Sequence, residues 1–353
     1  MKILHVTECL ATGVLDVIAR MSSKLSAEGC DVTVLHVPHP ESPSASELRH
    51  ALPGIRIVTG WGSGRARPLR VMGLALAMTK LLREDWDIVH LHSTFAGFVG
   101  RVRPSSIPIV YSPHGFSFLR HDVAPRAAAL FKFVERRLAR RADVIHCVSR
   151  DEHRVAAEQL RARPILLQNV LDSGSRWSAE TIHRPSRPPR VVNLGRWSQQ
   201  KAPERFVRAA SELHDVAEFR WIGTGEADVS GRWTVSGWLD QQALADELAS
   251  ASLVYFTSRW EGMPVGLMQA QAAGIPAIAI DCVGVADVVV DGITGHIARN
   301  EDEALSVLRR LLGSPSELNA LSASSRAGSG RFADVYYGRE LLEVYRVAAN
   351  AKS

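Results

Sequence analysis

The stretch at 252–280 constrains the fold of this chain most, because it has the pattern of a strand, a loop, a helix and a second strand. Pro264 suits the first turn of the helix, where a backbone N–H would have no intrahelical acceptor. We expect this helix to end at Gly274, which readily adopts the left-handed conformation of a helix cap, before a strand at 277–280. This order of elements predicts an α/β domain with a parallel sheet.

Glu261 and Gln269 are the polar side chains that stand out in this stretch. Glu261 follows the first strand and precedes the free N–H groups of the helix, a place where α/β sheets bind ligands and anions. Gln269 lies two turns into the helix on a similar face. A carboxylate and an amide near such a helix end suit a sugar nucleotide. The alternative is that Glu261 is only a helix-terminal charge and Gln269 a solvated surface residue.

A longer motif favours the functional interpretation. Residues 258–279 follow the pattern S-x-x-E-G-x-P-x-G-L-x-(E/Q)-A-x-A-A-G-x-P-x-I-A, and residues 284–295 follow G-x-x-(D/E)-x-V-x-(D/N)-G-x-T-G. The two patterns together closely resemble the signature of the family-4 retaining glycosyltransferases of the GT-B fold. The resemblance implies that Glu261 holds hydroxyls of the donor sugar. Gln269 replaces a glutamate that holds the donor ribose in the family, so we expect weaker donor binding.

Length and composition agree with a soluble globular protein of about two domains. The chain has 353 residues, of which 46% are hydrophobic and 22% charged. Its four cysteines form no C-x-x-C pair, so neither a zinc site nor a disulfide framework is indicated. The first residues have the pattern of a strand and not of a signal peptide, and the apolar segment at 71–82 is too short to span a membrane. We therefore expect a cytoplasmic protein.

The fold class follows from the opening of the chain and from the resemblance. Residues 3–37 have a strand–helix–strand pattern, which indicates a doubly wound parallel domain, and the loops at 38–53 and 60–68 are expected to be irregular. The resemblance implies two such Rossmann-like α/β domains, facing each other across a cleft. We place the acceptor-side domain at 1–172, a linker at 173–189, the nucleotide-sugar domain at 190–332, and a helix that packs back on the first domain at 333–353.

The first half offers two candidate site residues. The loop at Gly13 lacks a full G-x-G-x-x-G fingerprint, which gives nicotinamide or flavin binding little support. Relatives carry a glycine pair there, near the donor phosphate, and we transfer that role to Gly13. His114 ends a predicted strand at 107–111 and reads either as a core histidine or as a cleft residue. The resemblance implies that His114 contacts the sugar near the reacting carbon, whereas His90 and His92 read as structural.

The second half offers a diphosphate site. Arg196 and Lys201 flank a loop before a predicted helix. The planar guanidinium of Arg196, the flexible ammonium of Lys201 and the free N–H groups of the helix can together bind a diphosphate. The resemblance to the family motif G-R-x-x-x-x-K-G assigns the diphosphate to both residues, with Ala202 in the place of the usual glycine. It also implies that the turn at Gly223 lies beside the nucleotide and that the backbone of Trp238 and Leu239 frames the base.

The start of the helix after Glu261 completes the expected donor site. This helix start comprises Met263, Pro264, Val265 and Gly266, and all of these residues except Pro264 have a backbone N–H that can face the leaving diphosphate. Together with the two basic side chains, these groups would stabilise the growing negative charge. We therefore expect catalysis without a divalent metal and without a cofactor.

The segment at 127–141 is basic and helix-prone, with Leu130, Phe133, Val134 and Leu138 on one stripe. Such a helix can lie on an anionic membrane surface, or it can be a domain helix with a solvated basic side. Nucleic acid is the weaker expectation, because basic residues are not interleaved with aromatic ones.

The resemblance thus implies a retaining hexosyltransferase, which we expect to be metal-independent. Its donor is a nucleoside-diphosphate sugar (UDP- or GDP-linked), and its acceptor is a hydroxyl of a glycan or lipid-linked molecule, in cell-surface polysaccharide or glycolipid synthesis. The substitution at Gln269 leaves an alternative open, in which the chain is a catalytically degenerate, sugar-nucleotide-binding partner subunit of another glycosyltransferase.

Overall fold

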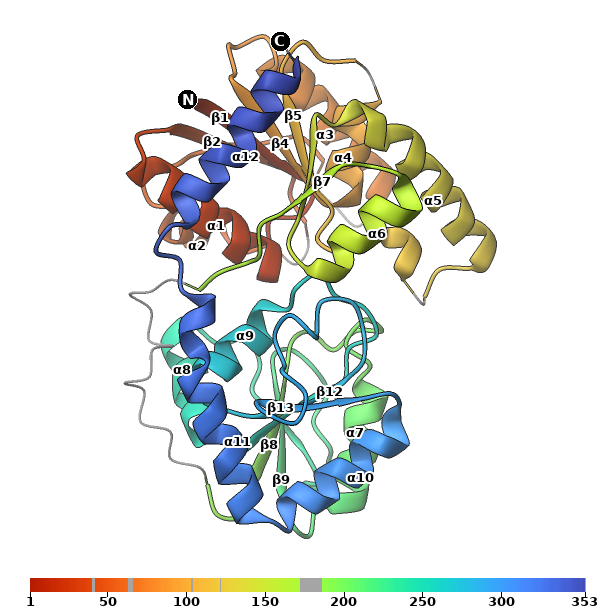
Figure 1. Cartoon of the computed structure of the whole chain (residues 1–353), viewed down its shortest axis with the longest axis vertical. Coiled ribbons are helices and arrows are strands. Elements are labelled where there is room, and N and C mark those ends of the chain that lie inside the picture. The colour runs from red at the N-terminus through yellow and green to blue at the C-terminus, as the bar shows by residue number, and fades with distance from the viewer. Residues whose placement is uncertain (40–41, 63–65, 103, 121, 172–185, 353) are drawn as a thin grey trace. The chain divides into compact units, whose positions relative to one another are not determined.

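The computed structural model describes the chain except for residues 40–41, 63–65, 103, 121, 172–185 and 353 (Figure 1). The chain forms two compact units. The first comprises Met1–Leu119, Val123–Asn169 and Val335–Ser353, and the second comprises Arg120–Asp122 and Val170–Asp334. The linker expected at 173–189 lies largely outside the described residues.

The first unit is built on a parallel sheet with the strand order β3-β2-β1-β4-β5-β6-β7. Its strands are β1 Lys2–Thr7, β2 Asp31–His36, β3 Arg56–Thr59, β4 Ile88–His92, β5 Ile109–Ser112, β6 Val144–Cys147 and β7 Pro164–Leu166. The central strands are buried on both faces, as strands covered by helices on each side are, and besides apolar residues they carry the buried His5, His90 and His92. The direction of winding reverses between β1 and β4, so this unit is doubly wound.

The helices of the first unit cover both faces of the sheet. They are α1 Thr12–Ala27, α2 Ala45–Ala51, α3 Arg67–Leu81, α4 Ser93–Arg101, α5 Pro125–Leu138, α6 Arg150–Leu160 and α12 Tyr337–Lys352. Helix α1 packs against α12 on one face, and α3 packs against α4 on the other (Figure 1). Helix α12 comes from the end of the chain and contacts β4, β5 and β6.

The expectation of an irregular loop at 38–53 is wrong, because this segment contains helix α2. Ser44 caps the helix by accepting a hydrogen bond from the N–H of Glu47, and the Glu47 carboxylate accepts the Ser44 N–H at 2.7 Å. This reciprocal arrangement is a capping box, and it satisfies two N–H groups that the first turn leaves without partners. The S-x-x-E spacing that forms it was present in the sequence.

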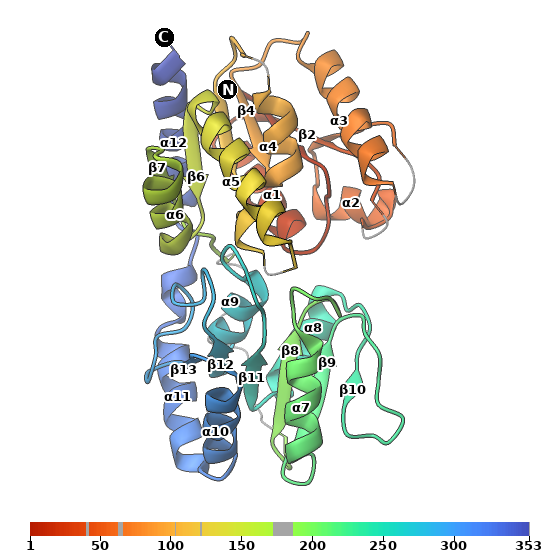
Figure 2. The ribbon, with the colours of Figure 1, turned by 90° about the vertical axis from the view of Figure 1, so that its right-hand side faces the viewer.

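The second unit repeats the plan with the strand order β10-β9-β8-β11-β12-β13, again parallel. Its strands are β8 Arg190–Leu194, β9 Glu218–Ile222, β10 Thr234–Val235, β11 Leu253–Phe256, β12 Ala277–Ile280 and β13 Gly295–Ala298. Its helices are α7 Pro203–Leu213, α8 Gln241–Ser250, α9 Val265–Ala272, α10 Glu301–Leu312 and α11 Pro315–Ala327. Helices α7 and α10 lie side by side on one face of this sheet (Figure 2), and α9 packs against α11.

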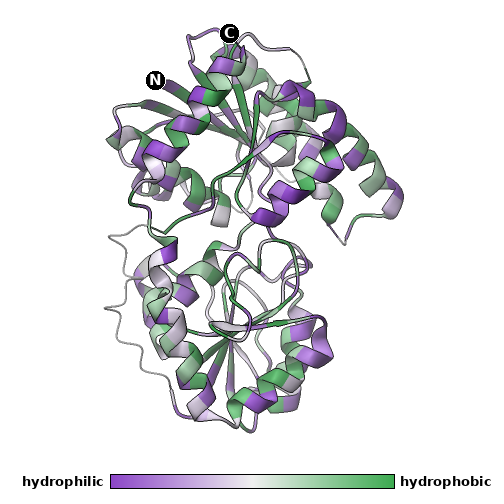
Figure 3. Cartoon of the chain, in the orientation of Figure 1, coloured by the Kyte–Doolittle hydropathy of each residue, from purple (hydrophilic) through white to green (hydrophobic). Residues whose placement is uncertain are grey.

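Hydropathy follows the layers of each unit, with hydrophobic strands and helices that alternate between hydrophobic and hydrophilic faces (Figure 3). Helix α9 differs, because it is buried along nearly its whole length. Its Gln271 side chain is therefore buried too, and its amide donates to the carbonyls of Ile275 at 3.0 Å and Thr294 at 2.9 Å. In the part of the chain that the structure describes, none of the helices combines the length and the apolar character that crossing a membrane requires.

Candidate functional site

Two loops of the second unit meet where its strand order reverses. Strand β8 lies between β9 and β11, and its Val191 and Val192 pair with Leu253 and Val254 of β11. The loops that leave the carboxyl ends of β8 and β11 therefore start side by side. In open α/β sheets this switch point is the place where ligands bind.

An ion pair joins these two loops. The Lys201 Nζ lies 2.7 Å from the Glu261 Oε1, and the side chains are 18% and 11% exposed. Lys201 also lies over the ring of Phe256, 4.9 Å from its centroid. Gln200 donates its amide to the carbonyl of Trp260 at 2.9 Å. The pair is thus held by surrounding groups and remains within reach of a ligand from solvent.

Buried hydrogen bonds fix the backbone beneath the ion pair. The Thr257 hydroxyl donates to the Lys201 carbonyl at 2.6 Å and accepts from the Asn193 amide at 2.6 Å. Arg205 donates to the Thr257 carbonyl at 2.9 Å. Asn193 and Thr257 were not predicted as site residues, although an asparagine among apolar strand residues is a usable signal, since buried polar groups need partners.

Two glycines let the neighbouring loops approach each other. Gly195 has φ +136°, and a Cβ there would lie 2.6 Å from the Lys201 Cε. Gly223 also has φ +136°, and its Cβ would lie 2.1 Å from the Gly195 carbonyl oxygen. Trp221 donates its ring N–H to the same carbonyl at 2.7 Å. Gly223 is therefore required for the packing of the loops that surround Lys201.

The other predicted donor-site residues lie at the same edge of the sheet. Arg196 follows Gly195 and is half-buried, and Trp238 and Leu239 follow β10, with Trp238 exposed. Met263, Pro264 and Val265 are buried at the start of α9, with Pro264 as the residue that precedes its first turn, and Gly266 is half-buried. Gln269 is only 7% exposed, so the alternative of a solvated surface residue is wrong.

A divalent metal at this site would need carboxylate ligands at the same edge of a sheet as the donor. The chain holds one Asp-x-Asp sequence, Asp85-Trp86-Asp87. It precedes β4 at the amino edge of the first sheet, opposite to the edge that carries His92, and the Asp87 carboxylate accepts the Lys2 N–H at 2.7 Å. This pair of aspartates therefore lies far from the carboxyl ends of the strands, where ligands of an α/β sheet bind.

In the first unit, His114 follows β5 with an unusual backbone. Its φ is +50°, and Gly115 follows with φ +97°. A left-handed conformation is unfavourable for a residue with a side chain, and such strain concentrates at functional sites. The carboxylate of Glu152 holds this turn, because it accepts the N–H groups of Gly115 and Val148. Glu152 is a residue that the sequence analysis did not anticipate.

His114 is also the outer member of a chain of imidazoles. Its Nε2 lies 2.9 Å from the Nδ1 of His92, and the His92 Nε2 lies 2.8 Å from the Nδ1 of His5. A second branch joins His90 to the Tyr345 hydroxyl at 2.9 Å and, through Ser112, to His146. Burial lowers the pKa of His5 and His114 to about 3, and that of His90 and His92 well below the usual range, so these rings are neutral near pH 7.

His5, His90 and His92 offer ring nitrogens that lie within 4.8 Å of one another, which raises the possibility of a metal site. Zinc binds imidazole through a ring nitrogen without a proton, at about 2.0–2.1 Å. His90 and His92 already use both ring nitrogens in hydrogen bonds. The geometry therefore favours a hydrogen-bonded network.

The structure corrects the surroundings of Gly13. It does not lie in a loop, because α1 begins at Thr12 and Gly13 is its second residue. The left-handed backbone belongs to Thr12, with φ +47°. A Cβ on Gly13 would meet no described atom within 4 Å. No protein contact therefore requires glycine here, and the open space beside it is available to a ligand.

The structure divides the apolar stripe expected on the basic segment between the surface and the interior. In α5, Leu130 and Phe133 are 59% and 57% exposed, whereas Val134 and Leu138 are half-buried. Glu135 points inward, where its carboxylate accepts from Arg101 at 2.8 Å. The outer face is therefore both apolar and cationic, and its exposed basic residues are Arg126, Lys132, Arg136 and Arg137.

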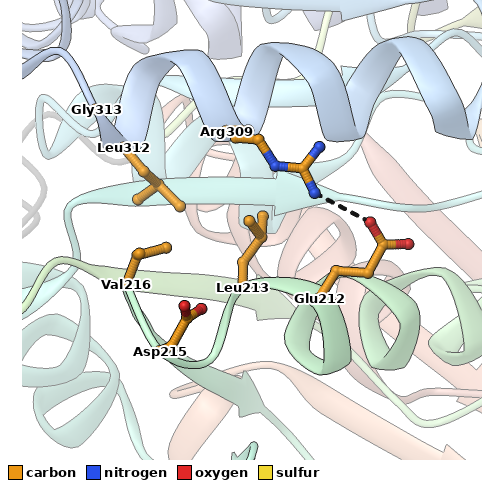
Figure 4. Close-up of a pocket in the computed structure, with 7 residues that line it drawn as sticks. All are labelled: Glu212, Leu213, Asp215, Val216, Arg309, Leu312 and Gly313. Carbon is orange, nitrogen blue, oxygen red and sulfur yellow. Dashed lines mark hydrogen bonds and ion pairs between the residues drawn. The ribbon is translucent and has the colours of Figure 1, made fainter.

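A separate pocket of about 270 Å³ lies between the ends of α7 and α10 (Figure 4). Glu212 and Arg309 form an ion pair of 3.2 Å on its wall. Helix α7 runs from the carboxyl edge of the sheet, so its last turn lies at the amino edge. This pocket is therefore distant from the Lys201–Glu261 pair and does not belong to the predicted site.

The comparison with protein families decides the identity of the fold. Residues 11–172 match the Glycosyltransferase Family 4 model, and residues 188–313 match the Glycosyl transferases group 1 model. The chain belongs to the family-4, group 1 glycosyltransferases. The glycosyltransferase matches the predicted class, and its two doubly wound α/β units are those of the GT-B fold.

Individual relatives have low sequence identity, but their alignments cover most of the chain. The glycosyltransferase is 25% identical to an uncharacterised 41.2 kDa protein of the cps region of Klebsiella pneumoniae, over 86% of this chain and 87% of the relative. It is 24% identical to the UDP-Gal:alpha-D-GlcNAc-diphosphoundecaprenol alpha-1,3-galactosyltransferase of Escherichia coli, over 61% of this chain and 63% of the relative. It is 27% identical to D-inositol 3-phosphate glycosyltransferase 1 of Catenulispora acidiphila, over 91% and 82%.

Solved structures support the fold of the glycosyltransferase. The sucrose-phosphate synthase of Thermosynechococcus elongatus aligns with a TM-score of 0.78 at 17% identity, covering 98% of both chains. The Anabaena protein HepE, in complex with UDP and glucose, aligns with a TM-score of 0.73 at 15% identity, covering 98% of this chain and 99% of HepE. At these identities the likeness establishes the architecture alone.

Proposed function

We propose that this glycosyltransferase moves a hexosyl unit from a nucleoside-diphosphate sugar to a hydroxyl of a glycan or lipid-linked acceptor, with retention at the anomeric carbon. The observation that carries the proposal is the Lys201–Glu261 ion pair above the β8–β11 switch point. It places a cation for a diphosphate beside a carboxylate for sugar hydroxyls. The E. coli and Anabaena relatives, whose names include UDP-galactose or UDP, agree with such a donor.

The chemistry requires stabilisation of a leaving group. The bond between the anomeric carbon and the donor phosphate oxygen breaks, the acceptor oxygen forms the new bond, and the proton of the acceptor hydroxyl passes to the departing phosphate oxygen. Negative charge grows on the diphosphate, where Arg196, Lys201 and the N-terminus of α9 stabilise it. Glu261 orients the sugar through its hydroxyls, and His114 lies near the anomeric carbon. These positive groups make a divalent metal unnecessary.

The pathway follows from the acceptor class. The relative from Klebsiella is a protein of the cps region, and the galactosyltransferase from E. coli is named for a diphosphoundecaprenol acceptor. We therefore place this glycosyltransferase in cell-surface polysaccharide or glycolipid synthesis, on the cytoplasmic side.

A binding panel tests the donor site. We would measure the melting temperature with UDP, GDP, ADP and their sugar conjugates, with and without magnesium, because a ligand of the native state raises it. One nucleotide should raise it by several degrees, independently of magnesium, and Lys201→Met should remove the shift. An equal shift in Lys201→Met would contradict the proposed site. NMR of the product sugar, read at its anomeric proton, then reports retention or inversion.

One observation favours a second function. Gln269 is a buried neutral amide where the family carries a glutamate, so this chain could bind the donor as the degenerate partner of an active transferase. A donor that binds but is never consumed would support that role. Gln269→Glu would then be expected to strengthen binding of the donor ribose.

Helix α5 supports membrane association of the proposed enzyme. Its outer face combines the exposed Leu130 and Phe133 with basic side chains, and its carboxylate Glu135 is buried. Each basic residue near an anionic surface contributes about 1 kcal/mol, and the apolar pair can enter the interface. The proposed acceptor, if lipid-linked, lies at that surface.

Vesicle sedimentation tests this surface. We expect binding to vesicles that contain phosphatidylglycerol and little binding to pure phosphatidylcholine. The double variant Leu130→Ser, Phe133→Ser should lose most of the binding. Leu76→Ser is a matched control, because Leu76 on α3 is equally exposed at 60%. Equal binding to both kinds of vesicle, or no effect of the double variant, would contradict the proposal.

A further inference from the structure

The imidazole chain that ends at His114 crosses three neighbouring strands. His5 lies on β1, His92 ends β4, and His114 follows β5. The strand register pairs Thr7 with His92 and His92 with Ser112. Successive strands of the sheet therefore bring three histidines into line at the carboxyl edge of the first unit, and two hydrogen bonds of 2.8 and 2.9 Å connect them.

The proton count of these rings leaves only two arrangements. A neutral imidazole carries one N–H, and His92 uses one nitrogen toward His114 and the other toward His5. If His92 carries its proton on Nδ1, it donates to His114 and accepts from His5. If it carries the proton on Nε2, it donates to His5 and accepts from His114. The tautomer of His92 thus determines the tautomers of both neighbours.

His5, at the buried end of the imidazole chain, distinguishes the two arrangements. The Nε2 of His5 is buried, and no described residue offers it a hydrogen-bond partner. In one arrangement this atom is a bare nitrogen, and in the other it is an N–H without an acceptor. Buried N–H groups without partners are rarer in proteins than acceptors that are under-satisfied. The arrangement in which His5 carries its proton on Nδ1 is therefore favoured.

We propose that His5 and His92 are positioning residues that hold His114 in its Nδ1–H tautomer. His5 donates from Nδ1 to the Nε2 of His92, which donates from Nδ1 to the Nε2 of His114. His114 then has its proton on Nδ1, the nitrogen that His92 does not use. The inference rests on the proposed function in one respect, which is that this N–H donates to an oxygen of the donor sugar.

Stacking and backbone restraint keep the ring of His114 in place. The rings of His92 and His114 stack with an interplanar angle of 8° and a centroid distance of 5.2 Å. The left-handed backbone of His114 and the Glu152 carboxylate fix the turn that carries it. Because burial lowers the pKa of all three rings, none of them takes up a second proton near pH 7 that would erase the tautomer preference. His114 is therefore held as a neutral imidazole whose Nδ1–H can donate a hydrogen bond.

The tautomer can be measured without any substrate. In protein labelled with ¹⁵N-histidine, the two ring nitrogens give separate pyrrole-type (N–H) and pyridine-type (bare) signals. We expect a pyrrole-type Nδ1 and a pyridine-type Nε2 for His114, and the same pattern for His92 and His5. A pyrrole-type Nε2 at His114 would overturn the proposal, whatever the enzyme's activity.

Variants separate positioning from packing. His92→Leu removes both hydrogen bonds and should give His114 mixed tautomers, whereas the amide of His92→Gln can still donate and accept and should restore Nδ1–H. His90→Gln is the control, because His90 is equally buried in the same cluster but directs its two ring nitrogens to Tyr345 and Ser112, not to His114. A tautomer change in His90→Gln as large as that in His92→Leu would assign the effect to packing and overturn the proposal. If His92→Leu fails to fold, His5→Phe removes the inner hydrogen bond instead.

Activity gives the second readout. With the donor identified by the binding panel, His92→Leu should lower kcat/KM by roughly tenfold or more, and His92→Gln should recover most of it. The melting-temperature shift with nucleoside diphosphate alone should not change, because that ligand is assigned to Lys201. Unchanged kcat/KM in His92→Leu would overturn the role of His114 as a sugar contact. If no donor is consumed by the wild type, the proposed function fails, and the NMR result still tests the tautomer.

Discussion

The Nζ of Lys201 lies 2.7 Å from the Oε1 of Glu261, so the cation assigned to the diphosphate is paired with the carboxylate assigned to the sugar before any ligand arrives. The two charges compensate each other in the partly buried site, where an unpaired charge would be costly. A bound diphosphate would compete with Glu261 for the ammonium group. Donor binding and the position of Glu261 are therefore expected to be coupled.

Glu261→Gln tests this coupling. The amide keeps a similar shape but no longer competes for Lys201, so nucleoside diphosphate without its sugar should bind as tightly as in the wild type, or several-fold tighter. Turnover of the sugar donor should fall by about tenfold or more, because the sugar loses a charged acceptor for its hydroxyls. Calorimetry and steady-state kinetics measure the two effects. Weaker binding of the nucleoside diphosphate itself would show that the charges are not in competition.

Ala202 carries a left-handed backbone, with φ +49°, at the residue before α7. Glycine adopts this conformation without the steric cost of a Cβ. We expect Ala202→Gly to raise the free energy of unfolding by up to about 1 kcal/mol, or to leave it unchanged. Ala209→Gly is the control, since Ala209 is equally buried inside α7, and there glycine should cost about 1 kcal/mol or more. Equal losses in both variants, measured by chemical denaturation, would contradict this explanation.

The substitution Gly13→Ala tests whether a ligand occupies the open space beside Gly13 at the start of α1. A Cβ there meets no described atom within 4 Å, so Gly13→Ala should stabilise the protein by about 0.5–1 kcal/mol through helix propensity. If the donor phosphate approaches this backbone, the same substitution should lower kcat/KM. A more stable and fully active Gly13→Ala would remove Gly13 from the site.

The histidine cluster predicts acid sensitivity. Burial holds the pKa of His5 and His114 at about 3 and that of His146 at about 4, whereas unfolded histidines titrate near 6.5. Between these values the unfolded state binds more protons, so the free energy of unfolding should fall as the pH decreases from 6.5 toward 4. Each ring contributes up to about 1.4 kcal/mol per pH unit. Burial raises the pKa of Asp16 to about 6 and also raises that of Glu8, and these two carboxyl groups act in the opposite direction.

Chemical denaturation between pH 7.5 and 5 measures this dependence. His146→Gln should reduce the slope by the contribution of one ring. A free energy of unfolding that does not change between pH 7 and 5 would contradict the assignment of neutral, buried rings.

Local signals explain the parts of the fold that the sequence predicted well. Strand β12 is a continuous apolar run that follows Pro276, and its residues 277–280 were predicted as the structure has them. Pro203 marks the first turn of α7 for the same kind of reason. Helix α2 was missed because the surrounding Pro, Ser and His residues suggested a loop, although the capping box at Ser44 indicated a helix.

Contacts between strands explain what the sequence could not predict. Lys201 and Glu261 belong to separate motifs, and the distance between them follows only from the pairing of β8 with β11. The line of His5, His92 and His114 depends in the same way on the register of β1, β4 and β5. Side-chain direction was the other limit, because a helical stripe does not reveal which side faces the core. The sequence left open whether Leu130 and Phe133 pack inside the domain or lie on its surface, and the structure exposes both.

Release of nucleoside diphosphate from the donor that binds tests the central claim most directly. The reaction would contain wild-type protein or Lys201→Met, with a synthetic lipid-diphosphate-linked sugar as acceptor or with water alone. We predict that the wild type consumes one of the nucleotide sugars and transfers the sugar to the acceptor. Lys201→Met should be slower by roughly 100-fold or more. A wild type that binds the donor without consuming it, or a Lys201→Met variant as fast as the wild type, would contradict the account.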